Sequence, residues 1–142
     1  MTDNSISLIR YTDTDFDNYY SLVKQDDVMK YISENGLSEE QARAKFNSIM
    51  AINAAENPLG YFKVFNAEGS CIGDCKLVKY KPDPSVLEIG YILRSEFWRM
   101  GYGSMICLEL IALADQTFPT ADIVGLIDPE NTASKKLLEK HG

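Results

Sequence analysis

The sequence predicts one α/β (α+β) domain with a mixed sheet and elements in the order β-α-α-β-β-β-α-β-α. A chain of 142 residues, 45% hydrophobic and 25% charged, suits a single domain, 1–142, with one core. Short strand-like apolar runs alternate with segments of helical periodicity. Residues 86–127 have the pattern strand, glycine loop, helix, strand, which predicts two parallel strands joined by a right-handed crossover.

The first part of the chain predicts one strand and two helices. Apolar alternation in ISLIRY (6–11) indicates a strand, and aromatic residues at helical spacing behind Asp and Thr caps indicate a helix over 13–25. A second helix starts at a capping box, in which the Ser38 and Gln41 side chains satisfy reciprocal backbone donors, and runs to about Ala55. Its predicted inward residues are Ala42, Phe46, Ile49 and Met50.

A hairpin and a central strand follow. The segments 61–65 and 71–80 are the expected hairpin strands, with a turn at 66–70. KPDPS then breaks the chain, and VLEIGYILR (86–94) is rich in the aliphatic and aromatic residues of a buried strand.

The last part predicts helix, strand, helix. MICLELIALADQTF (105–118) is apolar nearly all round, which favours a buried helix. ADIVGLI (121–127) is typical of a strand. NTASKKLLEKHG (131–142) predicts a helix with Asn131 as N-cap and Gly142 in the C-cap position.

Charge and hydropathy exclude several classes of partner. The net charge of −7 argues against nucleic acid, whose phosphates require a basic face. It permits a cationic partner, such as an amine or a basic peptide, or it serves only solubility. No apolar stretch approaches the roughly 18 residues of a membrane span. The polar, acidic N-terminus lacks a signal peptide, which predicts a cytoplasmic protein.

The cysteine and histidine content argues against a metal or disulfide framework. Cys71, Cys75 and Cys107 are an odd number without C-x-x-C spacing. His141 is the only histidine, so neither a histidine metal cluster nor a Ser-His-Asp triad is expected.

The loop EFWRMGYGSM (96–105) carries the clearest binding motif. A helix N-terminus presents free N–H groups and partial positive charge, and Gly101 and Gly103 let an anion approach the backbone. Arg99 stands where it can donate to phosphate oxygens. This chemistry suits a pyrophosphate, although a G-x-G pair also eases a tight strand-to-helix turn. A dinucleotide fingerprint is not met, because Ile106 holds its third glycine position.

In this context WRMGYG resembles the Q/R-x-x-G-x-G/A motif of the GCN5-related N-acetyltransferases, with Trp98 at the Q/R position. A large residue there is common in the ribosomal-protein (Rim-type) branch. LEIGYIL, PENTASKKLLEKHG and the early DDVMKYIS and LSEEQA segments resemble the same branch, in the same order, over essentially the whole chain.

One departure concerns the C-terminus. In the family an aromatic residue and two more strands follow the last helix, whereas this chain stops at Gly142. The resemblance therefore implies a C-terminally incomplete domain with the last two strands missing. The strand at 122–127 would then be an exposed edge, which predicts pairing with another chain, for example as a homodimer.

The resemblance implies transfer of an acetyl group from acetyl-CoA, as co-substrate, to a primary amine by direct attack and without a metal. The acceptor would be a protein N-terminus, a basic peptide or a small amine. Glu88 is the implied base, with a salt-bridged strand residue or a substrate-binding carboxylate as alternatives. Ser134 is the implied donor to the leaving sulfur, because Leu138 replaces the tyrosine of many members; a serine bonded to its own helix backbone is the alternative.

The resemblance also implies the acetyl-CoA contacts. Unpaired backbone of Ile92, Leu93 and Arg94 would hold the pantetheine arm, with Asn131 as a further contact. The pyrophosphate loop would comprise Arg99, Met100, Gly101, Tyr102, Gly103 and Ser104.

Two other functions remain open from the sequence. A non-catalytic acyl-CoA-binding or interaction module is consistent with the missing tyrosine and strands. A dinucleotide-dependent oxidoreductase fits poorly, because one β-α-β unit is too few and the glycine spacing is wrong.

Overall fold

A computed structural model describes residues 5–30, 33, 35–55, 59–80 and 83–125. Its five strands are β1 (Ile6–Arg10), β2 (Gly60–Asn66), β3 (Cys71–Tyr80), β4 (Asp83–Leu93) and β5 (Ile123–Gly125). Its helices are α1 (Phe16–Val23), α2 (Asp26–Met29), α3 (Glu39–Ala55) and α4 (Tyr102–Thr117), with short 3-10 turns η1 (Asp13–Asp15) and η2 (Ser95–Phe97).

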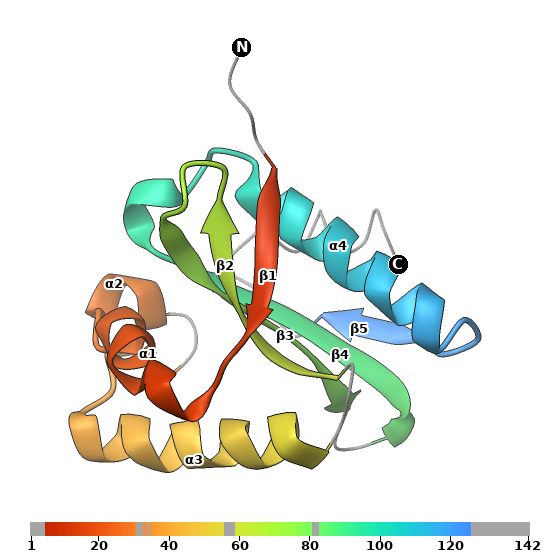
Figure 1. Cartoon of the computed structure of the whole chain (residues 1–142), viewed down its shortest axis with the longest axis horizontal. Coiled ribbons are helices and arrows are strands. Elements are labelled where there is room, and N and C mark those ends of the chain that lie inside the picture. Colours follow the sequence, from red (N-terminus) through yellow and green to blue (C-terminus); the bar gives the residue numbers. More distant parts are fainter. Residues whose placement is uncertain (1–4, 31–32, 34, 56–58, 81–82, 126–142) are drawn as a thin grey trace.

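The strands form one mixed sheet in the order β1-β2-β3-β4-β5 (Figure 1). Neighbours from β1 to β4 are antiparallel, and β5 is parallel to β4. The predicted α/β class, the hairpin and the parallel pair around α4 are therefore confirmed. The predicted helix at 131–142 and the last two residues of the predicted strand at 121–127 lie outside the described residues.

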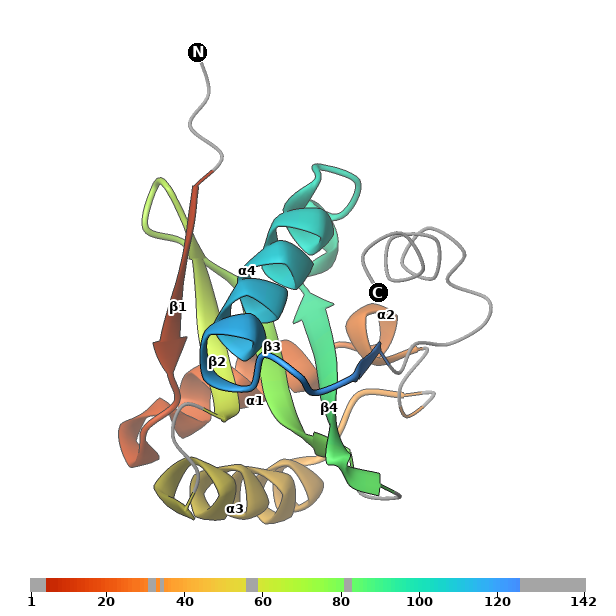
Figure 2. The same ribbon diagram turned by 90° about the vertical axis from the view of Figure 1, so that its right-hand side faces the viewer.

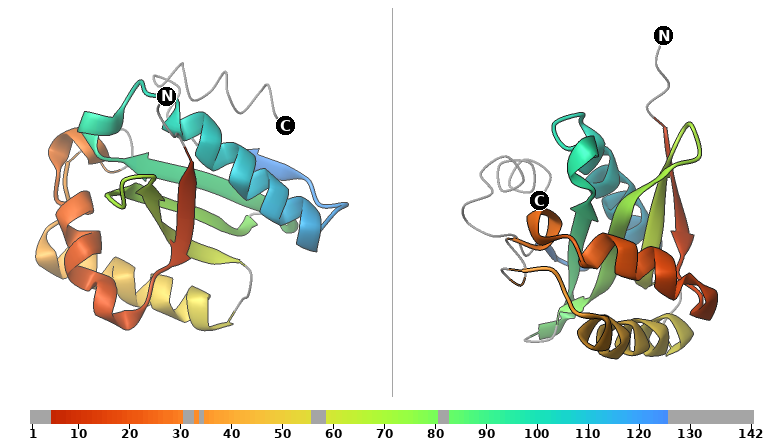
Figure 3. Two further views of the ribbon diagram at one scale, coloured as in Figure 1. Left: turned by 45° about the horizontal axis from the view of Figure 1, so that its top comes forward. Right: turned by 90° about the vertical axis from the view of Figure 1, so that its left-hand side faces the viewer.

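The helices cover opposite faces of the sheet (Figures 1 and 3). Helix α4 packs on one face, over Ile89 and Leu93 of β4, and crosses the sheet in Figure 2. Helices α1, α2 and α3 cover the other face and form a second core, against which Tyr61 and Ile92 pack. Because side chains alternate along a strand, odd-numbered residues of β4 face α4 and even-numbered ones face α1–α3.

Helix α3 forms as the capping-box pattern predicts. The Ser38 N–H donates to Gln41 Oε1 at 2.9 Å, and the Gln41 N–H donates to Ser38 Oγ at 3.2 Å. Three predicted inward residues are fully buried and the fourth is half-buried: Ala42, Phe46, Ile49 and Met50.

Several element starts differ from the sequence prediction, three of them by three residues, and β5 begins at Ile123 instead of residue 121. Strand β4 begins at Asp83 because its pairing with β3 continues, after a register shift, to an Asp83–Tyr80 pair. Helix α1 begins at Phe16, since a 3-10 turn precedes it. Helix α4 begins at Tyr102, so its N-terminus lies directly in the glycine loop.

Within the described ranges, two features that would suggest a membrane or a metal are absent. There, no helix has both the length and the apolar character needed to cross a membrane. The same residues contain no group of three or more His, Cys, Asp or Glu side chains able to hold a metal ion.

Gly73 marks a close approach between β3 and β4. Ile72 is an extra residue in β3 relative to β2, since Val64 pairs with Gly73 and Phe65 with Cys71. A Cβ atom at position 73 would overlap the Ile92 carbonyl oxygen and lie 2.9 Å from Leu93 Cα. Only glycine fits there without moving backbone.

We therefore predict that Gly73→Ala destabilises the fold by about 1–3 kcal/mol, because the strands must separate to admit a methyl group. The measurement is urea unfolding followed by circular dichroism. An unchanged unfolding midpoint would contradict the close approach.

A buried carboxyl lies in the α1–α3 core. The Tyr11 hydroxyl donates to Asp74 Oδ2 at 2.9 Å, and Asp74 is 4% exposed. Burial raises the Asp74 pKa to about 7, against opposing contributions from the Tyr11 hydrogen bond and nearby Lys76. Burial and the Asp74 charge also raise the Tyr11 pKa, so this hydroxyl remains a donor.

This carboxyl makes stability depend on pH. Its pKa in the folded chain is above the unfolded value, so its stabilising effect is complete below about pH 4 and is lost as the pH rises through 7. The Asp74→Asn variant lacks this titration. We expect its unfolding free energy to gain on the wild type between pH 5 and pH 8, by up to about 3 kcal/mol. Parallel pH profiles for the two chains would contradict the assignment.

Candidate functional site

The glycine loop leaves the start of α4 open. Gly101 is the N-cap residue, with φ of 86°, and no side chain caps this end. The first helical hydrogen bond is donated by the Met105 N–H to the Gly101 carbonyl at 3.3 Å. The N–H groups of the first helical positions are therefore directed out of the helix end, where an anion can accept from them.

Two neighbouring residues hold the loop in place. The Trp98 indole Nε1 donates to the Leu93 carbonyl at 2.9 Å, which ties the loop to the end of β4. Arg99 has φ of 63°, a left-handed conformation that costs energy for a residue with a Cβ. Its side chain is exposed at the mouth of the loop.

The two glycines have different roles. Around a Cβ placed at Gly101 nothing lies within 4 Å, so this position is open as the anion interpretation requires. A Cβ at Gly103 would lie 2.5 Å from the Tyr91 hydroxyl oxygen and 2.8 Å from Cζ. Gly103 therefore makes room for a ring from β4, a packing reason that sequence reasoning missed.

The other loop candidates divide into exposed and buried groups. Met100 is 59% exposed, and Ser104 is half-buried. The Tyr102 ring is buried in the α4 core against Phe97, with centroids 6.1 Å apart. Its ring therefore points into the core, and its backbone N–H is the group that is left for the predicted phosphate contact.

Strands β4 and β5 pair in parallel over their described residues. Their described pairing runs from Leu87–Ile123 to Ile89–Gly125. The Leu87 N–H donates toward β5, to the Asp122 carbonyl at 2.9 Å, whereas the Arg94 N–H donates toward β3, to the Ile72 carbonyl at 2.9 Å. Since backbone groups alternate along a strand, those of Tyr91 and Leu93 face the β5 side.

This alternation corrects the predicted pantetheine contacts. The backbone groups of Ile92 and Arg94 face β3, and the Arg94 N–H is bonded to the Ile72 carbonyl, so these are not the unpaired groups that were expected. The contact expected of Leu93 stays a prediction. The alternation of residues along β4 can be predicted from the sequence, but whether odd- or even-numbered residues face β5 depends on how the strands pair.

The Arg94 side chain connects distant segments. Its Nε donates to the Cys71 carbonyl at 3.1 Å, and its Nη2 donates to Ser21 Oγ at 2.8 Å. These bonds join the end of β4 to β3 and α1. Arg94 therefore has a structural role.

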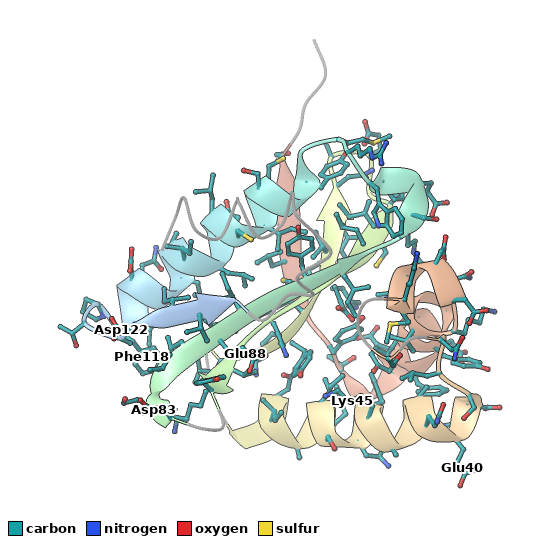
Figure 4. The ribbon with its side chains drawn as sticks, turned by 180° about the vertical axis from the view of Figure 1, so that it is seen from behind. Glu40, Lys45, Asp83, Glu88, Phe118 and Asp122 are labelled. Atoms are coloured by element: carbon teal, nitrogen blue, oxygen red, sulfur yellow. The ribbon has the colours of Figure 1, made fainter. Side chains whose placement is uncertain are left out.

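Glu88 lies on the face of β4 turned toward α1–α3, in the middle of the sheet, and α3 with Lys45 lies below it in Figure 4. It is 7% exposed and forms an ion pair with Lys76 of β3. The ion pair of the salt-bridged alternative is therefore present, and the role of Glu88 as base stays a prediction. Glu88 also pairs with Val124 inside the β4–β5 ladder.

Tyr61 and Lys45 complete this face. Tyr61 pairs with Lys76 across β2 and β3, and burial, followed by the charges of Asp74 and Glu88, raises its pKa to about 12. The Lys45 ammonium lies 5.6 Å from the Tyr61 ring centroid. Sequence reasoning missed Tyr61 and Lys76, because which residues of β2, β3 and β4 share a face depends on the register between the strands.

Ser134 and Asn131 lie outside the described residues. Their predicted roles therefore stay predictions.

Comparisons with known proteins agree with this geometry. The family model of the acetyltransferase (GNAT) domain matches residues 6–142. An uncharacterized N-acetyltransferase, YnaD of Bacillus subtilis (strain 168), is 27% identical over 128 residues, which are 90% of this chain and 72% of that protein.

Solved structures share the fold. A GNAT-family acetyltransferase from Bacillus anthracis superposes with a TM-score of 0.77 at 24% identity, over 100% of this chain and 81% of that one. Spermidine N-acetyltransferase from Vibrio cholerae, in complex with CoA and spermine, gives a TM-score of 0.76 at 18% identity, over 96% and 79%. On the family match, this chain belongs to the GNAT family and is an acetyl-CoA-dependent acetyltransferase.

Proposed function

We propose that the chain transfers the acetyl group of acetyl-CoA to a primary amine by direct attack, as a member of the Rim-type branch. The observation that carries this proposal is the open, uncapped start of α4 beside the end of β4, where the Leu93 N–H faces away from β3. The first feature suits a diphosphate, and the second suits an extended arm carrying amides.

The proposed acetyl-CoA contacts follow from the open donors. The N–H groups of Tyr102, Gly103 and Ser104 bind the pyrophosphate, with Arg99 and Met100 at the rim. The backbone of Leu93 pairs with the pantetheine arm, as an additional strand would. The Leu93 carbonyl already accepts from Trp98, so its N–H is the group on offer.

Glu88 is the proposed base. It takes a proton from the acceptor ammonium, and the neutral amine attacks the thioester carbonyl carbon. The nitrogen–carbon bond forms, the carbon–sulfur bond breaks, and the sulfur leaves with the electron pair. We propose Ser134 as the donor to that sulfur and Asn131 as a further contact to the arm.

The acceptor is proposed to be cationic. The net charge of −7 and the Glu88 carboxylate favour an ammonium group, from a peptide N-terminus or a small amine. The Vibrio cholerae relative, a spermidine N-acetyltransferase, supports the small-amine class. A cysteine carrier is not proposed, because Cys107 is buried and burial raises its pKa to about 11.

A non-catalytic acyl-CoA-binding module is the second candidate. The observation that favours it is the Lys76 ion pair, which occupies the candidate base. Thiol release with a panel of amines separates the two, since a binding module takes up acetyl-CoA without turnover.

The loop assignment predicts that Gly101→Val weakens acetyl-CoA binding at least about tenfold, because the side chain enters the open space and opposes φ of 86°. The measurement is isothermal titration calorimetry. Gly69→Val is the matched control, since Gly69 has φ of 84°, equally open surroundings and a place in the β2–β3 turn. Equal affinities of the two variants would count against the loop.

The base assignment predicts that Glu88→Gln lowers kcat/KM for the amine by about 10²-fold or more while acetyl-CoA affinity is kept. Initial rates of thiol release give kcat/KM. Asp83→Asn, on the same strand but fully exposed, is the control and should keep wild-type rates. Undiminished turnover by Glu88→Gln would exclude Glu88 as the base.

A further inference from the structure

We propose that Lys76 is a self-acetylation site: with acetyl-CoA bound and no external amine present, its Nζ accepts the acetyl group. This inference rests on the proposed function, and it assigns the chain's own amine as an alternative acceptor.

Gly90 leaves room for the Lys76 side chain to reach from β3 over β4. Lys76 of β3 pairs directly with Gly90 of β4, and a Cβ at Gly90 would lie 3.1 Å from Lys76 Cε and 3.7 Å from Cγ. The lysine stem therefore lies over the glycine backbone. It carries the ammonium away from its own strand and toward the β5 side of the sheet.

The ammonium ends beside the proposed base. Lys76 Nζ is ion-paired with Glu88 Oε2. An amine that Glu88 deprotonates must lie within hydrogen-bond reach of that carboxylate, and Lys76 already does.

Other lysines on this face differ in their surroundings. Lys63 of β2 is also ion-paired, at 2.9 Å, but with Asp15 of η1. Its side chain is 15% exposed, against 28% for Lys76. Lys63 is therefore an internal reference for amines that are paired but remote from Glu88.

The step balances without another reactant. The Lys76 ammonium gives one proton to Glu88, and the neutral Nζ attacks the thioester carbonyl carbon. The nitrogen–carbon bond forms, the carbon–sulfur bond breaks, and CoA leaves as the thiolate, which takes up the second proton lost from nitrogen. The product is an uncharged amide at Lys76, which no longer forms an ion pair with Glu88.

The test incubates the full chain with acetyl-CoA alone and follows acetylation of each lysine by peptide mass spectrometry. We expect Lys76 to be acetylated at least about tenfold faster than Lys63, and Glu88→Gln to slow Lys76 acetylation by about 10²-fold. Lys76→Arg keeps a cation beside Glu88 and should abolish the fast acetylation at position 76, whereas Lys63→Arg should leave the acetylation of Lys76 unchanged.

Calorimetry with acetyl-CoA, run on the same samples, distinguishes the two possible failures. If acetyl-CoA binds and external amines turn over, but Lys76 reacts no faster than Lys63, the inference is overturned and the proposed function stands. If acetyl-CoA does not bind, both fail. A misfolded Lys76→Arg variant does not affect the test, because site mapping on the wild type decides it.

Discussion

The structure depends on the alternation of backbone groups along β4. Over residues 87–94, the backbone groups of even-numbered residues bond to β3, while those of odd-numbered residues face the β5 side. One strand thus holds the sheet together on one side and turns the Leu93 N–H to the other. The same alternation places Glu88 on the α1–α3 face and Ile89 in the α4 core.

Local signals in the sequence predicted much of the fold. The Ser38–Gln41 capping box, the hairpin and the glycine loop each depend on neighbouring residues, and each forms close to where it was expected. Element starts were less accurate, because they depend on pairing between distant segments. The start of β4, for instance, follows from its register with Tyr80.

The site was predicted less completely, because its contacts join distant positions. The Tyr91 ring against Gly103 and the Lys76 stem over Gly90 both require the observed register and packing. Single residues gave no sign of either contact, since tyrosine, lysine and glycine are all common in strands and loops. Gly101 was easier to interpret, because a glycine directly before an apolar run is typical of the start of a helix, and Gly101 is the N-cap residue of α4.

The bond between Trp98 and the Leu93 carbonyl fixes the position of the loop relative to the strand. The helix amides and the Glu88 carboxylate are thereby attached to opposite ends of one rigid segment, separated by five residues or about 16 Å. An acyl donor engages both ends only if its charged group and its reactive carbon are comparably far apart. Under the proposed function, short donors such as acetyl phosphate reach one end but not both, so the length of the strand selects the donor.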